Sequence, residues 1–251
     1  MHGQYRIFAS AEALALTLAD EIIHRLEAAA GRDFHLAVSG GRTPGIIFER
    51  LALVLPATLS SRLHIWWADE RVVPPDDPES NYGLFARTFL SRHPLSAGQV
   101  HRVRGEAGPE EACAALREAL LVLAEDECRA AWRCQPVFDC VLLGAGSDGH
   151  TASIFPGNEE IFASDEPCLA VRHPLSGQWR VTLTPALIGA AREVVYCVTG
   201  ADKAPLVAQV FSRDEGRPGH LPVLRVRSQT GATLWYLDRE AAGRLPGPAE
   251  K

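Results

Sequence analysis

The stretch LLGAGSDGHTASIFP at 142–156 places an aspartate and a histidine two residues apart in a glycine-rich turn. Glycines let the backbone bend sharply and approach a ligand closely, so Asp148 and His150 can project into one pocket. An imidazole titrates near neutral pH and can take a proton from water, while a neighbouring carboxylate fixes its tautomer. The spacing therefore predicts an acid–base pair. The alternative is that Asp148 caps a short helix and that His150 is an ordinary surface residue.

A dinucleotide-binding turn is a second function that the same stretch could serve, because 144–149 reads Gly-x-Gly-x-x-Gly after an apolar run. That fold needs a helix of useful length after the third glycine, and an acidic residue on a second strand about 20 positions later. Pro156 instead interrupts the chain seven residues after Gly149. Asp165 and Glu166 lie in ASDEPC, which does not resemble a strand. The sequence thus favours the acid–base pair.

A candidate anion site lies at SGGRTP (39–44), between a predicted strand and a predicted helix. Backbone N–H groups, hydroxyls and a guanidinium at a helix start suit a phosphate. The residues that would supply them are Ser39, Gly40, Gly41, Arg42 and Thr43. Thr43 is expected to cap the helix, with Pro44 at its first position. The alternative is a tight turn with no ligand; no Gly-Lys-Ser/Thr follows, so this is not a Walker A loop.

Three further cations stand near predicted strand ends, namely Arg71, Arg180 and Lys203. Arg71 is expected to contact an oxyanion or a phosphate, with Asp69 or Glu70 holding its guanidinium and Asn81 tying down the loop at 74–81. Lys203 sits in the first turn of a predicted helix, where a bound anion would offset its unfavourable position in the helix dipole. Singly, each could be a surface charge. Together with the acid–base pair they describe a metal-free site for a small phosphorylated molecule.

The elements that must position these residues alternate between strands and helices from end to end. Strands are expected at 4–10, 34–39, 62–68, 137–144, 180–184, 193–200 and 232–238. Helices are expected after Ser10, after Thr43, up to about Leu90, and at 109–131, 185–191 and 201–211. This alternation predicts an α/β fold with a mostly parallel sheet and helices on both faces. Ligands bind at the carboxyl ends of such strands, so the loops after residues 39, 68, 144 and 200 should meet.

The composition narrows the remaining possibilities. The chain has 251 residues, 47% of them hydrophobic, and a formal net charge of −6, which gives no sign of general nucleic-acid affinity. No apolar run reaches the roughly 18 residues of a membrane span. Six cysteines form no Cys-x-x-Cys pair, which argues against structural zinc and for reduced thiols in the cytoplasm. We expect one domain at 1–242, compatible with a small lobe around 150–180, and a flexible tail at 243–251.

The motifs SGGRTP, DERVVPPDDPESN, GAGSDGHTASIFP, RVTLTPALI and VTGADKA, in this order, resemble the lactonases of the glucosamine-6-phosphate isomerase/6-phosphogluconolactonase family. The resemblance covers about residues 5–240. It implies a Rossmann-like sheet, no cofactor, and hydrolysis of 6-phospho-D-glucono-1,5-lactone to 6-phospho-D-gluconate in the oxidative pentose phosphate pathway. We also expect a monomer or homodimer, and the composition argues against nucleic-acid or membrane partners. The roles that the resemblance implies are a general base at His150 beside Asp148, and substrate binding at Gly40, Gly41, Arg71, Arg180 and Lys203.

Two rival functions share this fold, a sugar-phosphate isomerase or deaminase and a non-catalytic sugar-phosphate-binding regulator. The isomerases continue the Asp-Gly-His turn as Ile-Ala-Phe-Asn-Glu-Pro, and the glutamate assists ring opening; the matching position here is Phe155. Ester hydrolysis needs only activated water and support for an oxyanion, which favours the lactonase. No Gly-x-Ser-x-Gly elbow is present. Ser147 and Ser153 lack an evident partner base, so an acyl-enzyme is not expected.

Overall fold

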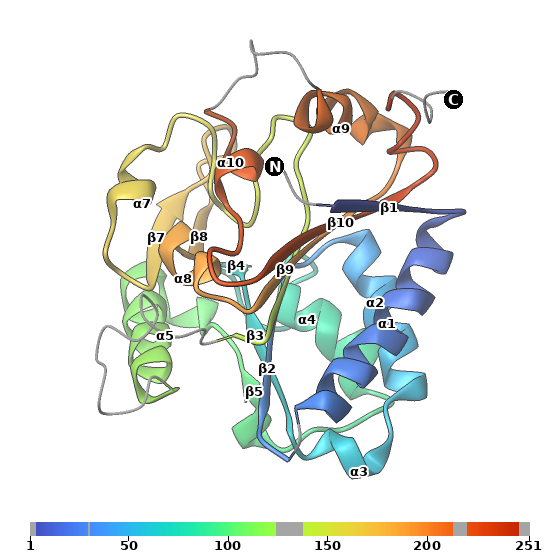
Figure 1. Ribbon diagram of the computed structural model, residues 1–251. Coiled ribbons are helices and arrows are strands. Elements are labelled where there is room, and N and C mark those ends of the chain that lie inside the picture. The colour runs from blue at the N-terminus through green and yellow to red at the C-terminus, as the bar shows by residue number, and fades with distance from the viewer. Residues whose placement is uncertain (1–3, 30, 124–137, 213–219, 246–251) are drawn as a thin grey trace.

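The computed structural model describes residues 4–29, 31–123, 138–212 and 220–245. In this part of the chain, a seven-stranded sheet has the order β1-β10-β9-β6-β2-β3-β5, and all of its neighbouring strands are parallel (Figure 1). The strands are β1 (Gln4–Phe8), β2 (Phe34–Val38), β3 (Leu63–Trp67), β5 (Val100–His101), β6 (Cys140–Leu143), β9 (Glu193–Val198) and β10 (Ala232–Asp238). The expected α/β class is confirmed.

Helices cover both faces of this sheet. They are α1 (Ala11–Ala28), α2 (Arg42–Val54), α3 (Ala57–Ser60), α4 (Asn81–Phe85), α5 (Pro109–Leu123), α7 (Glu160–Ala163), α8 (Pro185–Gly189), α9 (Ala204–Phe211) and α10 (Pro222–Arg225). Figure 1 shows α1 and α2 on one side, with α5, α7 and α8 on the other. A π-helical turn continues α4 to Leu90. Ser10 caps α1 by accepting a hydrogen bond from the Ala13 N–H, as its sequence predicts.

A second, antiparallel sheet lies beside the main one. It consists of β4 (Asp69–Arg71), β8 (Trp179–Leu183) and β7 (Cys168–Arg172), in that order. The sequence predicts β8 but not β4 or β7, because three residues are too few to show an alternating pattern and β7 follows a polar loop. This sheet matters for the site because β4 and β8 carry Arg71 and Arg180.

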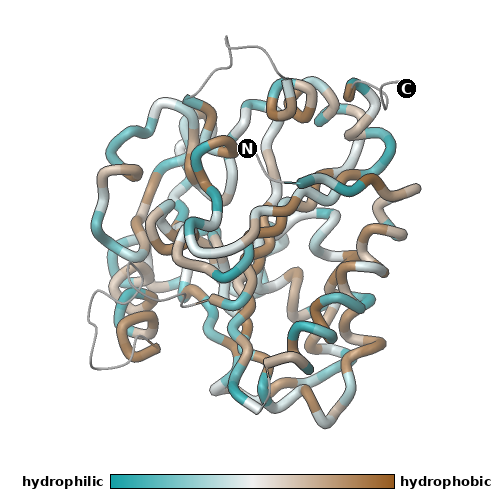
Figure 2. Tube along the Cα trace, in the orientation of Figure 1, coloured by the Kyte–Doolittle hydropathy of each residue, from teal (hydrophilic) through white to brown (hydrophobic). Residues whose placement is uncertain are grey.

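The main sheet has a topological switch point between β2 and β6. From β2 the chain proceeds outward through β3 to β5, whereas from β6 it proceeds through β9 to β10 on the other side. Because the two connections diverge, a crevice opens beyond the carboxyl ends of β2 and β6. The loop that starts at Ser39 and the loop that starts at Gly144 both border it. The central strands β2, β3, β6 and β9 are hydrophobic along most of their length and form part of the buried core (Figure 2).

Some of the expected boundaries are wrong. Thr43 does not cap α2: the helix begins at Arg42 after Gly41, whose φ of 110° suits glycine, and the Thr43 hydroxyl lies 2.7 Å from that of Thr199. Pro44 is consequently the third helical residue, where its missing N–H still leaves no bond unmade. Part of the helix expected at 109–131 and most of the tail expected at 243–251 lie outside the described residues, and the division into domain and tail stays a prediction.

Candidate active site

A pocket of about 230 Å³ lies at the carboxyl ends of the central strands. It is lined by Ser39, Gly40, Asp69, Arg71, Asn81, Gly144, Ala145, Gly146, His150, Ala152, Arg180 and Lys203. These residues come from the segments after β2, β6 and β9 and from the small sheet. The four loops that the sequence singles out therefore meet at one place.

His150 and Asp148 form a directly bonded pair at this pocket. The Nδ1 atom of His150 lies 2.6 Å from Oδ1 of Asp148, which also accepts the His150 backbone N–H at 3.1 Å. Partial burial acts to raise the pKa of Asp148, but the hydrogen bonds and charge of His150 outweigh it and hold that pKa below its ordinary value. An ionised carboxylate favours the tautomer with a proton on Nδ1, which leaves Nε2 as the basic nitrogen. Asp148 thus orients an imidazole rather than capping a helix.

The backbone between Gly144 and Thr151 is fixed by its own hydrogen bonds. The Gly146 N–H donates to the His150 carbonyl at 2.9 Å, and the Thr151 hydroxyl donates to the Gly144 carbonyl at 2.9 Å. Gly149 has a φ of 86°, and a β-carbon there would lie 2.8 Å from the Leu221 side chain. The glycines therefore serve the turn that presents His150, and a dinucleotide helix does not follow them.

The residues of the loop after β2 divide between two neighbouring pockets. Ser39 and Gly40 line the pocket of His150, and the Ser39 hydroxyl is buried without a hydrogen-bond partner among the described residues. Gly41 and Arg42 line an adjoining pocket of about 540 Å³, which also borders Arg71 and Asn81. Thr43 borders neither, since it faces Thr199.

Arg71 and Arg180 stand directly opposite each other on β4 and β8. Like charges at such a cross-strand position repel. Nη1 of Arg71 donates to the Glu79 carbonyl at 2.5 Å, and Nη1 of Arg180 lies 3.8 Å from Oδ2 of Asp69. Burial lowers the pKa of Arg180, and both Nε atoms are buried without a partner in the described chain. An anion between the two guanidinium groups would relieve this arrangement.

Lys203 brings the third cation to the pocket. Its Nζ atom donates to the Ser147 hydroxyl at 3.1 Å and lies 3.2 Å from Oδ2 of Asp202. Ser147 in turn donates to Asp202 at 3.4 Å. The sequence gives no signal for these contacts, because residues 147 and 202 are joined only by the adjacency of β6 and β9. They anchor Lys203 to the same turn that carries His150.

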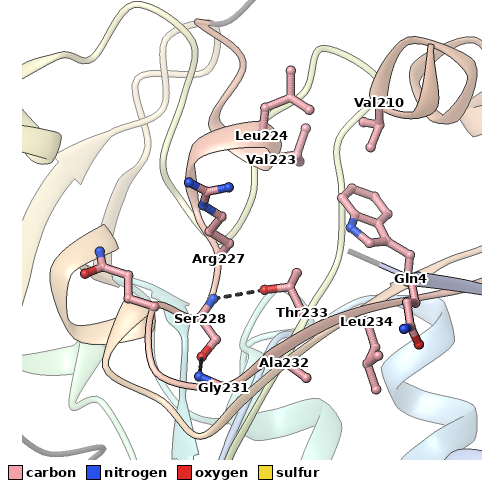
Figure 3. Close-up of a pocket in the computed structure, with 12 residues that line it drawn as sticks. Gln4, Val210, Val223, Leu224, Arg227, Ser228, Gly231, Ala232, Thr233 and Leu234 are labelled. Atoms are coloured by element: carbon pink, nitrogen blue, oxygen red, sulfur yellow. Dashed lines mark hydrogen bonds between the residues drawn. The ribbon is translucent and has the colours of Figure 1, made fainter. Parts of the chain in front are cut away.

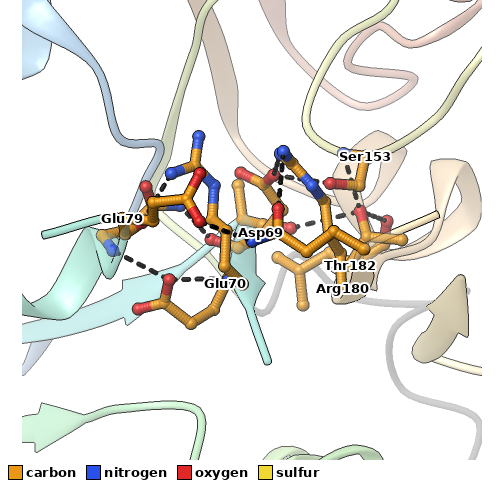
Figure 4. A network of polar contacts seen from close by, with 11 residues as sticks. Asp69, Glu70, Glu79, Ser153, Arg180 and Thr182 are labelled. Atoms are coloured by element: carbon orange, nitrogen blue, oxygen red, sulfur yellow. Dashed lines mark hydrogen bonds and ion pairs between the residues drawn. The ribbon is translucent and has the colours of Figure 1, made fainter. Parts of the chain in front are cut away.

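Neither Asp69 nor Glu70 holds the Arg71 guanidinium, which corrects the expectation from sequence. Figure 4 shows the Asp69 carboxylate reaching Ser153, whose hydroxyl donates to it at 2.7 Å, and Arg180. Glu70 lies on the other side of the strand. Burial raises the pKa of Glu70, and three backbone hydrogen bonds oppose that rise. Ser153 is therefore a buried partner of Asp69 rather than a nucleophile.

Glu70 closes the loop that ends at Asn81. Its carboxylate accepts backbone N–H groups from Arg71, Asn81 and Tyr82 at 2.7–2.8 Å, and the Ser80 hydroxyl at 3.3 Å. Asn81 then donates from Nδ2 to the Asp69 carbonyl at 2.8 Å, as expected for a residue that ties the loop down. The position of Arg71 is set by this buried carboxylate through the backbone.

A larger pocket of about 680 Å³ lies elsewhere, between β10, α9 and α10 (Figure 3). Its polar groups include Ser228 and Thr233, which bond each other: the Ser228 N–H donates to the Thr233 hydroxyl at 3.0 Å. Val210, Val223 and Leu234 supply apolar surface. The pocket holds a cation, Arg227, but no acid–base pair, so the smaller pocket is the better candidate for the active site.

The sequence predicts neither a metal site nor a membrane-spanning segment. Among the described residues, no three side chains of histidine, cysteine, aspartate or glutamate gather as metal ligands would. That the protein works without metal or cofactor stays a prediction. No helix in the described ranges has both the length and the apolar character needed to cross a membrane.

Comparison with known proteins places this geometry in a family. A family model described as glucosamine-6-phosphate isomerases/6-phosphogluconolactonase matches residues 9–235. The chain belongs to this family. The 6-phosphogluconolactonases of Haemophilus influenzae and Homo sapiens are 36% and 35% identical to it, over 84% and 99% of this chain and 87% and 96% of theirs. The structure of 6-phosphogluconolactonase from Trypanosoma cruzi has a TM-score of 0.82 at 26% identity, and 97% of each chain is covered.

Within the glucosamine-6-phosphate isomerase/6-phosphogluconolactonase family, the residue at 155 bears on the reaction. Phe155 is 4% exposed, and its ring centroid lies 5.2 Å from that of His150 and 4.9 Å from that of His173. A buried aromatic ring thus stands next to the imidazole at the position where the isomerase motif has a glutamate. The Phe155 ring can pack against the imidazole but cannot transfer a proton.

Proposed function

We propose that this protein hydrolyses 6-phospho-D-glucono-1,5-lactone to 6-phospho-D-gluconate, with His150 as the general base. The observation that carries the proposal is the His150–Asp148 pair in one pocket with Arg71, Arg180 and Lys203. The acid–base pair suits water activation, and the three cations suit a phosphorylated substrate. The lactonases to which the chain is similar support the same reaction.

The phosphate is proposed to dock at the start of α2, on the loop 39–43. Backbone N–H groups at a helix start, the Ser39 hydroxyl and the ammonium of Lys203 offer donors to its oxygens. Arg180 adds a counter-charge, because burial makes its unneutralised charge unfavourable. With the phosphate held there, the lactone carbonyl lies toward His150.

The reaction then proceeds through a tetrahedral intermediate. His150 takes a proton from water at Nε2, and the hydroxide adds to the lactone carbonyl carbon. Arg71, or backbone N–H groups near 146–150, stabilises the oxyanion. The imidazolium, which Asp148 stabilises, returns its proton to the ring oxygen as the carbon–oxygen bond breaks. This proposal needs no metal, because protein cations neutralise both negative charges.

The two rival functions make different demands on the site. Aldose–ketose isomerisation needs a group that helps to open the sugar ring, and Phe155 cannot serve as one. A regulator without turnover needs no base, yet His150 is oriented by a short hydrogen bond to Asp148. These observations favour hydrolysis over both.

A spectroscopic assay with freshly prepared lactone tests the proposal. Because the lactone also opens spontaneously, an enzyme-free reaction is the control, and a parallel reaction with glucosamine 6-phosphate tests for isomerase or deaminase activity. We expect acceleration of lactone opening only, unchanged after treatment with a chelator. No acceleration over the control, or turnover of the amino sugar instead, would overturn the assignment. Loss of activity on chelation would overturn its metal-free part.

A further inference from the structure

Two buried thiols lie together outside the proposed active site. Cys113 is on α5 and Cys168 is the first residue of β7, and their Sγ atoms are 3.6 Å apart. Each thiol also lies near the other residue's carbonyl, with Sγ of Cys113 3.5 Å from the Cys168 oxygen and Sγ of Cys168 3.4 Å from the Cys113 oxygen. The pair therefore bridges two elements that are 55 positions apart in the chain.

The two sulfurs are not equivalent. Cys113 retains 7% exposure, whereas Cys168 is fully buried. The hydrogen bond from Cys168 lowers the pKa of the Cys113 thiol, and Arg117, one turn further along α5, lowers it further. The same hydrogen bond and burial raise the pKa of Cys168. Cys113, which is nearer the surface and nearer Arg117, is thus the more readily ionised thiol.

An ion pair also joins α5 to the segment before β7. Nε of Arg117 on α5 lies 2.9 Å from Oε2 of Glu166, two residues before Cys168. Cys140 and Cys197 offer a contrast: both are buried in the main sheet, and burial raises the pKa of each thiol. Reactivity among the described cysteines therefore concentrates at Cys113.

We propose that Cys113 and Cys168 form a reversible disulfide on exposure to a peroxide, and that this bond fastens α5 to β7. The Cys113 thiolate attacks one oxygen of hydrogen peroxide, so that a sulfur–oxygen bond forms, the oxygen–oxygen bond breaks and water leaves after protonation. Cys168 then attacks the sulfenic sulfur, the sulfur–sulfur bond forms, and hydroxide leaves with the thiol proton as a second water. Two thiols are oxidised and one peroxide is reduced to two waters.

The bond should stabilise the fold while leaving turnover unchanged. Cys168 pairs with Leu183 on β8, whereas Arg180 pairs with Val171 toward the other end of β7. Closing a loop of this length restricts the unfolded chain, so we expect a rise in Tm of about 5–10 °C. The disulfide would therefore raise the stability of the fold without changing turnover.

Peptide mapping of peroxide-treated protein tests the proposal. Cys128 and Cys134 lie outside the described residues, so both are replaced by serine in the starting protein. We expect a loss of two hydrogens per chain, a cross-linked peptide joining 113 to 168, the higher Tm, and reversal of all three by dithiothreitol. A bridge between Cys140 and Cys197, no bridge, or an unchanged Tm in bridged protein would each refute the proposal.

Two variants separate the roles of the sulfurs. Cys168→Ala should accumulate a sulfenic acid at Cys113 that dimedone labels, because the resolving thiol is gone while Arg117 still favours the thiolate. Cys113→Ala should give neither label nor cross-link. Circular dichroism of the reduced variants shows whether each is folded. If a variant does not fold, the peptide mapping of the parent protein still tests the proposal. Equal labelling of both variants would contradict the assignment of Cys113 as the reacting thiol. Loss of lactone turnover on oxidation would contradict the placement of the bond away from the site.

Discussion

The ring of His150 packs closely against Gly146. A β-carbon at position 146 would lie 2.1 Å from Nδ1 of His150 and 2.5 Å from Oδ1 of Asp148. Gly146→Ala should therefore push the imidazole out of place while leaving the fold intact. A displacement of about 1 Å can reduce turnover about 10²-fold, and we expect kcat to fall by that order. Gly98→Ala is the matched control, because nothing lies within 4 Å of a β-carbon there and Gly98 does not line the pocket. Equal kcat in the two variants would argue against the observed packing.

Removing the imidazole itself should have the larger effect. His150→Ala is expected to lower kcat by about 10²–10⁴-fold, the usual contribution of a general acid–base group. Asp148→Asn should also lower kcat, because an amide can donate to Nδ1 and stabilise the wrong tautomer. Steady-state kinetics with the lactone measure both. Undiminished turnover in His150→Ala would remove this residue from the mechanism.

Lys203 is expected to affect binding more than turnover. Lys203→Ala removes a charge-assisted contact to the phosphate, and such contacts contribute about 1.5–3 kcal/mol, so KM should rise about tenfold or more. The unphosphorylated lactone should not distinguish the variant from the wild type. Arg239→Ala removes an exposed cation elsewhere and serves as the control. A fall in kcat with unchanged KM would instead place Lys203 at the reacting carbonyl.

Glu70→Gln tests whether the buried carboxylate holds the loop that ends at Asn81. An amide has one acceptor oxygen and presents N–H groups to donors, so at least one backbone N–H should lose its partner, at about 1–3 kcal/mol. We expect Tm to fall by about 2–10 °C and KM to rise as Arg71 and Asn81 shift. Glu110→Gln, on the exposed face of α5, is the control. Tm and KM values equal to those of the control would show that the network does not position Arg71.

The stability of the protein should fall in mild acid because of two histidines in the main sheet. Burial lowers the pKa of His35 and of His101 to about 4 from 6.5, and His64, which lies beside both, adds to the effect. Between those pH values the unfolded chain binds more protons than the folded one, so the free energy of unfolding declines as pH falls from 6.5 to 4. His101→Phe, which can keep the stacking on Trp66, should flatten this dependence of Tm on pH. A parallel decline in both proteins would contradict it.

The central strands and the acid–base turn could be predicted because their signals are local. Apolar runs mark β2, β3, β6 and β9, and Asp148 and His150 are two residues apart in one turn. The network that supports them joins distant segments. Ser153 bonds Asp69 across 84 positions, and Thr43 faces Thr199 across 156, so no window of sequence contains either contact.

The pairing of Arg71 with Arg180 likewise could not be predicted from a local signal. A strand of three residues, β4, brings Arg71 opposite Arg180, and strands this short carry no periodicity. The sequence marks both arginines as anion-binding candidates, which stays a prediction, but the carboxylate partner that it gives Arg71 is wrong. Glu70 instead satisfies backbone N–H groups, since a buried loop must find acceptors for its own amides.

Because the chain diverges at β2 and β6, the pocket forms only when both halves of the main sheet are folded. The loop after β2 belongs to one half of the sheet and the turn of His150 to the other. The two halves join where Leu36 and Ala37 pair with Cys140 and Val141, and the Thr43 and Thr199 hydroxyls meet above that pairing. Because the pocket takes residues from both halves, we expect a bound sugar acid to protect slowly exchanging amides in both halves equally, by the mass-action stabilisation of the native state.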